Sequence, residues 1–150
     1  LLLIGDGPER QSIEQLCRDC QYCEDIRFVG KLDTIEEVLS VADLFILPSE
    51  KESFGLAALE AMACEVPIIS TNTGGIPELN VQGVTGYLSN VGDVDDMVKN
   101  ALFVLQPENL DTFKQNALQR ALEFDVNRIV PIYEAYYQEI IDKVSTEVVW

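Results

Sequence analysis

Two glutamates with a Phe-Gly pair between them have residue types and spacing suited to binding chemistry. Glu52 and Glu60 are separated by eight positions, and Phe54 and Gly55 lie between them. An ionised carboxylate accepts several hydrogen bonds, which suits the vicinal hydroxyls of a ribose or hexose. A helix starting near Gly55 would present amides without intrahelical partners, and the helix dipole would favour a diphosphate there. The plain alternative is a solvated loop charge and an exposed helix residue.

A second candidate is Gly5, in a turn between an apolar run and a helix that begins near Pro8. Glycine at such a turn lets the backbone approach a phosphate at a helix N-terminus. The chain lacks both the G-x-G-x-x-G and the Walker pattern, so an ordinary strand-to-helix turn remains the alternative. This position needs a supporting second site.

Four cysteines raise the question of a metal site. Cys17, Cys20 and Cys23 form C-x-x-C-x-x-C, and Cys64 is distant in sequence. One interpretation is a thiolate cluster for zinc or iron–sulfur, and the other is three free thiols near a helix end. We expect free thiols and no metal, because iron–sulfur runs of this kind usually continue to a nearby fourth cysteine.

Short apolar runs alternate with helical patterns along the whole chain, which predicts an α/β fold. The expected architecture is a Rossmann-like open parallel sheet with helices on both faces and right-handed crossovers. Ligands of such folds bind at the carboxyl ends of the strands. The run at 43–49 is nearly all apolar, as a central strand would be. We expect strands at 1–5, 26–30, 43–49, 67–71 and 85–89, with helices after 8 and 33 and over 55–64, 93–105, 110–123 and 126–143.

Several residues predict where these helices begin or bend. Asp33 is a plausible N-cap with Glu36 in capping-box position. Asp93 or Asp95 is expected to cap a helix, although the pair also has the D-x-D spacing of a metal site. Pro131 is expected to bend the last helix rather than end it.

Composition bounds the classes of protein. The chain has 150 residues, 47% of them apolar, and a formal net charge of −16. This length fits one domain, and the charge would repel nucleic acid. The chain shows no transmembrane or signal segment, and its first residues look like a strand cut at its edge. We therefore expect a cytoplasmic protein, of which residues 1–150 are one piece.

Much of the chain resembles the retaining glycosyltransferases of the fourth sequence family, which have the GT-B fold. The resemblance implies that the chain is the C-terminal half, binding a nucleotide-sugar donor, and that a missing N-terminal domain holds the acceptor. The matching stretches are Leu3-Ile-Gly-Asp-Gly-Pro8, Ile26-Arg-Phe-Val-Gly-Lys31, Ala42-Asp-Leu-Phe-Ile-Leu-Pro-Ser49, the E-x7-E motif, Glu60-Ala-Met-Ala-Cys64, Val66-Pro67, Gly74-Gly-Ile-Pro-Glu78 and Gly83-Val-Thr-Gly-Tyr-Leu88.

The resemblance also implies roles for individual residues. Glu52 would act in catalysis by holding donor-sugar hydroxyls, and Glu60 would bind the ribose. The remaining contacts would come from backbone, with Gly74 and Gly75 only shaping a turn. The amides of Phe54, Gly55 and Leu56 would bind sugar and diphosphate, and the loop around Gly30, Lys31 and Leu32 would hold the base.

Within the family, residues 49–56 are most similar to a subfamily that joins N-acetylglucosamine to L-malate in bacillithiol synthesis. This implies UDP-N-acetylglucosamine as donor, with no separate cofactor, and an Arg and a Lys for the diphosphate upstream of residue 1. Glu65 departs from the pattern, because many relatives have glycine there. The isolated chain is expected to be inactive. A non-catalytic nucleotide-sugar-binding module, a GT-B-like epimerase and, more distantly, a response-regulator-like domain are the alternatives.

Overall fold

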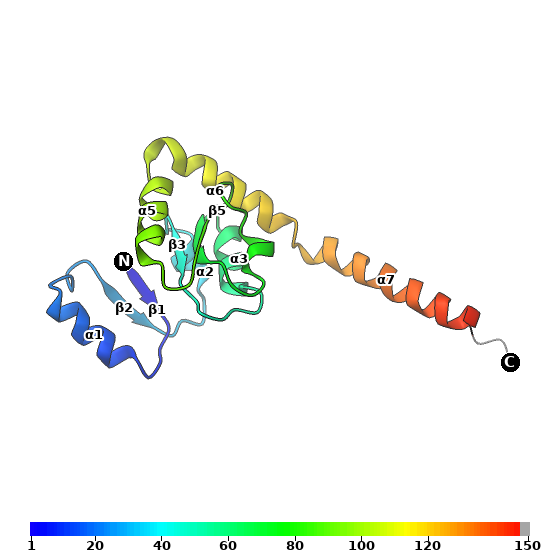
Figure 1. Ribbon diagram of the computed structural model, residues 1–150, viewed down its shortest axis with the longest axis horizontal. Helices are drawn as coiled ribbons and strands as arrows, with labels where there is room; N and C mark the ends of the chain where they lie inside the picture. The colour runs from blue at the N-terminus through cyan, green and yellow to red at the C-terminus, as the bar shows by residue number, and fades with distance from the viewer. Residues whose placement is uncertain (148–150) are drawn as a thin grey trace. The chain divides into compact units, whose positions relative to one another are not determined.

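The strands of the computed structural model, which describes residues 1–147, pair only in parallel (Figure 1). One sheet contains β1 (Leu2–Ile4) and β2 (Arg27–Gly30), and the other has the order β3 (Phe45–Leu47), β4 (Ile68–Thr71), β5 (Gly86–Ser89). The α/β class with parallel sheets is confirmed. The expected single sheet is instead two, because within the described residues β1 pairs with β2 alone and β3 reaches only β4.

The central strand of the larger sheet is β4, not the apolar run at 43–49. Every residue of β4 is buried, whereas β3 has two half-buried residues around the exposed Ile46. The reason is the pairing: β4 is flanked by β3 and β5, while β3 has a partner on one side only among the described strands. High hydrophobicity alone therefore pointed to the wrong strand.

Helices follow the strands much as the sequence predicts. A short helix, α4, forms where a turn was expected. The helices are α1 (Arg10–Asp19), α2 (Glu36–Leu39), α3 (Leu56–Ala63), α4 (Ile76–Leu79), α5 (Val94–Val104), α6 (Pro107–Leu122) and α7 (Val126–Glu147).

The helix-start predictions have mixed outcomes. The Asp93 side chain accepts a hydrogen bond from the Asp96 amide at 3.1 Å, which confirms Asp93 as the cap of α5. The Asp33 prediction is wrong, because α2 begins at Glu36 and Asp33 lies too far upstream to be its N-cap. Pro131 lies inside α7, so it does not end that helix.

The core around the larger sheet joins β4 to α5 and α6. Ile69, Met97, Val104 and Phe113 form a buried cluster. The Phe113 ring packs against Tyr87, with 5.8 Å between ring centroids, so β5 is tied to α6. These contacts fix the sheet on which the loops after β3 and β4 are built.

The chain divides into two compact units, Leu1–Glu37 and Val38–Trp150. The first contains β1, α1 and β2, and the second contains the three-stranded sheet and the later helices. None of the helices within residues 1–147 is both long enough and apolar enough to cross a membrane.

Candidate functional site

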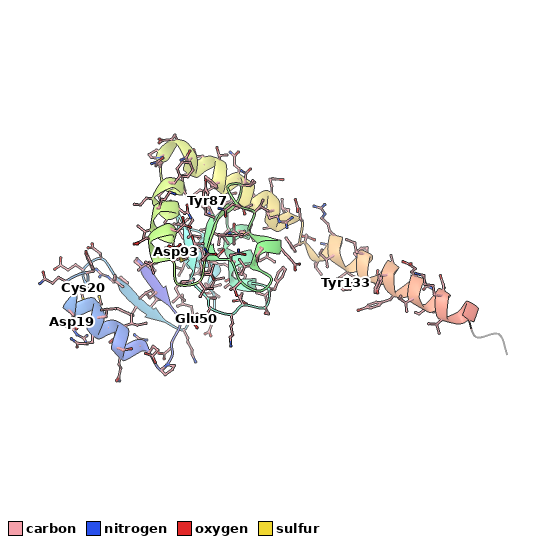
Figure 2. The ribbon with its side chains drawn as sticks, in the orientation of Figure 1. Asp19, Cys20, Glu50, Tyr87, Asp93 and Tyr133 are labelled. Carbon is pink, nitrogen blue, oxygen red and sulfur yellow. The ribbon has the colours of Figure 1, made fainter. Side chains whose placement is uncertain are left out.

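In the second unit, the loop of residues 49–55 leaves the carboxyl end of β3 and leads into α3. Glu50 marks this loop in Figure 2. Glu52 is half-buried, and its Oε1 accepts a hydrogen bond from the Ser53 amide at 3.0 Å. The orientation of the Glu52 carboxylate therefore depends on the backbone at 52–53. The loop lies at the sheet edge where parallel α/β folds bind ligands.

Gly55 forms the start of α3 in a left-handed conformation, with φ +95°. This conformation disfavours residues with a side chain, and a Cβ here would also lie 2.8 Å from the Ile76 Cδ1. The Leu59 amide donates to the Gly55 carbonyl at 3.0 Å, which closes the first helical turn. Helix geometry leaves the amides at 56–58 without intrahelical partners. An anion can bind at such amides.

Glu60 lies on the exposed face of α3, four positions after the exposed Leu56. The opposite face is buried through Ala58, Ala61 and Met62. Residues four apart on a helix share a face, so the start of α3 and the Glu60 carboxylate lie along one exposed side. The predicted residues 52–60 thus form one continuous stretch of chain, which runs from the loop before α3 onto the solvent-exposed face of that helix.

The Phe54 side chain has a packing role that sequence reasoning missed. Its ring contacts Phe124 edge-on, with 5.5 Å between centroids. The Arg120 guanidinium lies 4.9 Å from the centroid of the Phe124 ring. Phe54 thereby anchors the 49–55 loop to the turn that follows α6, a contact between residues 70 positions apart that no local pattern indicates.

In the first unit, the structure brings Gly5 and Gly30 together at the ends of β1 and β2. The Gly5 amide donates to the Gly30 carbonyl at 2.8 Å, and both have positive φ. Lys31 and Leu32 follow directly and are exposed. Sequence reasoning did not place Arg10 near this turn. The Arg10 guanidinium lies beside Gly30, because a Cβ added to Gly30 would be 3.6 Å from Arg10 Nη1. Its i, i+4 spacing to Glu14 was the available signal.

The cysteines occur as free thiols. Cys17 is buried, while Cys20 and Cys23 are exposed. A hydrogen bond with Cys23, followed by burial, raises the pKa of the Cys17 thiol to about 11. Within the described part of the chain, no group of three Cys, Asp or Glu side chains is arranged to hold a metal ion.

The sequence that forms these elements matches the model of a known protein family. The family model described as glycosyl transferases group 1 matches residues 1–120. The chain belongs to this family. The expectation of a glycosyltransferase domain is therefore confirmed, while the roles of single residues remain predictions.

Individual relatives agree with this membership. N-acetyl-alpha-D-glucosaminyl L-malate synthase of Bacillus anthracis is 44% identical over 146 residues, which are 94% of this chain and 38% of that protein. The chain thus spans less than half of the length of that relative.

Solved structures show the same GT-B fold. Sucrose-phosphate synthase from Thermosynechococcus elongatus has a TM-score of 0.83 at 28% identity, over 95% of this chain and 39% of that one. HepE from Anabaena, in complex with UDP-glucose, has a TM-score of 0.77 at 25% identity, over 97% of this chain and 40% of that one. The GT-B expectation is confirmed.

Proposed function

We propose that the full-length protein is a retaining glycosyltransferase and that this chain binds its donor, UDP-N-acetylglucosamine. The observation that carries the proposal is the helix start at Gly55, with Glu52 before it and Glu60 on the exposed face beyond it. Free amides suit a diphosphate, and carboxylates suit the sugar and ribose hydroxyls. The 44% identity to the malate synthase supports N-acetylglucosamine as the sugar and L-malate as the acceptor.

In this proposal Glu52 holds the sugar, Glu60 holds the ribose, and the amides of Phe54, Gly55 and Leu56 hold sugar and diphosphate. The acceptor hydroxyl forms a bond to the anomeric carbon on the face from which UDP departs. The bond between that carbon and the diphosphate breaks, UDP takes the electron pair, and the hydroxyl proton is released. Amides at the start of α3 stabilise the charge on the departing diphosphate.

The remaining assignments concern the nucleotide and the rest of the protein. Gly5, together with the loop of Gly30, Lys31 and Leu32, is proposed to contact the nucleotide. The acceptor and the Arg and Lys of the diphosphate site are assigned to chain outside these 150 residues. The isolated chain is therefore proposed to be inactive, and the full-length protein to act in the cytoplasm.

The deciding experiment is an assay of the full-length protein with UDP-N-acetylglucosamine and a panel of acceptors that includes L-malate. We expect release of UDP that depends on malate, and a product with retained anomeric configuration by NMR. UDP release with another acceptor would correct the acceptor alone. Epimerised sugar, or binding of UDP-N-acetylglucosamine without consumption of any sugar donor, would refute the transferase proposal.

A further inference from the structure

A second segment, residues 71–75, packs against the 49–55 loop and donates hydrogen bonds to it. The Thr71 hydroxyl donates to the Ser49 carbonyl, and the Thr73 hydroxyl donates to the Glu50 carbonyl at 3.2 Å. The Gly75 amide donates to the Ser53 carbonyl at 3.1 Å. Three alternate residues of the 71–75 segment thus donate to three carbonyls of the loop.

Gly74, between two of these donors, lies directly against Glu52. A Cβ on Gly74 would be 1.6 Å from the Glu52 carbonyl oxygen and 2.8 Å from its carbonyl carbon. The obstacle is backbone, so rotation of a side chain cannot relieve it. Gly74 also has φ +55°, where a side chain adds strain. A substitution at Gly74 must therefore displace the backbone of one segment or the other.

This backbone determines where the Glu52 carboxylate points. The carboxylate accepts from the Ser53 amide, and the Ser53 carbonyl is held by Gly75. Glu60, by contrast, belongs to α3, which packs mainly against α6 and whose buried residues include Ala58, Ala61 and Met62. A change in the segment is therefore expected to move Glu52 more than Glu60.

We propose that Thr73 and Gly74 are positioning residues that set the location of Glu52 relative to the donor sugar. This inference rests on the proposed function and deepens it, since the Gly-Gly turn does more than reverse the chain. The Glu52 and Glu60 carboxylates should therefore respond differently to changes in this segment. Turnover of the nucleotide sugar should depend on the 71–75 segment more strongly than binding of free UDP, to which Glu60 also contributes.

The test uses the full-length protein with UDP-N-acetylglucosamine and L-malate. Thr73→Val removes the hydroxyl and should lower kcat/KM for the donor about 5-fold, the effect of one hydrogen bond. Thr73→Ser keeps the hydroxyl and should restore it. Gly74→Ala should lower kcat/KM about 100-fold, as small displacements of catalytic groups do. In Thr73→Val and Gly74→Ala, the inhibition constant of UDP should change less than kcat/KM does.

The matched control is Gly92→Ala, because Gly92 also has positive φ, at +83°, but a Cβ there meets nothing within 4 Å. It should lose stability without losing turnover. Wild-type kcat/KM in Thr73→Val and Gly74→Ala would overturn the inference, as would UDP inhibition that weakens in parallel with turnover. Should Gly74→Ala fail to fold, the Val and Ser pair at Thr73 decides.

Hydrogen exchange separates this inference from the proposed function. Peptides covering residues 49–55 should exchange faster in Thr73→Val and Gly74→Ala than in Thr73→Ser and Gly92→Ala. A wild-type protein that consumes no sugar donor refutes the proposed function. Exchange in the 49–55 loop then still decides whether the 71–75 segment positions it, and unchanged exchange would overturn that role.

Discussion

The Thr85 hydroxyl donates a hydrogen bond to the side-chain oxygen of the fully buried Asn80, at 2.9 Å. The Asn80 amide nitrogen in turn donates to Ser70 Oγ at 2.8 Å and to the Tyr87 carbonyl at 3.1 Å. Asn80 therefore links β4, β5 and the end of α4. Buried polar groups satisfied in this way are expensive to disrupt.

Asn80→Ala should lower the free energy of unfolding by about 2 to 4 kcal/mol, because its buried partners lose hydrogen bonds. Urea unfolding of the 150-residue chain measures this. The exposed Asn90 provides the control, and Asn90→Ala should stay near the wild-type value. A loss at Asn80 no larger than at Asn90 would contradict the importance of the network.

Glu60→Ala should weaken UDP binding to the full-length protein about 10-fold, the effect of losing hydrogen bonds to a charged acceptor. Calorimetry with UDP measures the dissociation constant. Glu108→Ala, on the exposed first turn of α6, is a matched loss of negative charge and should leave binding unchanged. Equal dissociation constants for the wild type and Glu60→Ala would show that the ribose assignment is wrong.

Cys17 should react with iodoacetamide more slowly than Cys20 and Cys23 at neutral pH. Its hydrogen bond with Cys23 and its burial raise its pKa from 9.0 to about 11, and the thiolate is the reactive form. Mass spectrometry of the alkylated peptides gives the three rates. Cys23→Ala removes the first cause and should speed alkylation of Cys17; no change would refute the hydrogen-bond explanation.

The same shift predicts a pH dependence of stability. A thiol whose pKa is higher in the folded state favours folding below the pKa of the unfolded chain, and this contribution is lost as pH rises through the folded value. Stability should therefore fall between about pH 9 and about pH 11. Urea midpoints across this range measure it, and Cys17→Ala should flatten the decline.

Glu65→Gly should stabilise the chain. Glu65 has φ +63°, and a side chain in this left-handed conformation costs about 1 to 2 kcal/mol. Replacement by glycine removes this strain, but glycine loses more backbone entropy on folding, which offsets about 0.5 to 1 kcal/mol of the gain. Thermal unfolding should show a higher Tm. Glu108→Gly, at a helical position, should instead lower Tm, and a fall in both variants would contradict the strain at Glu65.

The sequence by itself determined the α/β class, the position of most elements, a helix cap at Asp93 or Asp95 and the helix start at Gly55. These depend on hydrophobic period, capping and glycine, which act between near neighbours in the chain. The E-x7-E motif, with the stretches around it, also identified the family. Only the tertiary structure decided that β4 is central, that Asn80 joins β4 to β5, and that the 71–75 segment packs against the backbone of Glu52. Each of these depends on contacts between residues distant in sequence, whose partners no local pattern specifies.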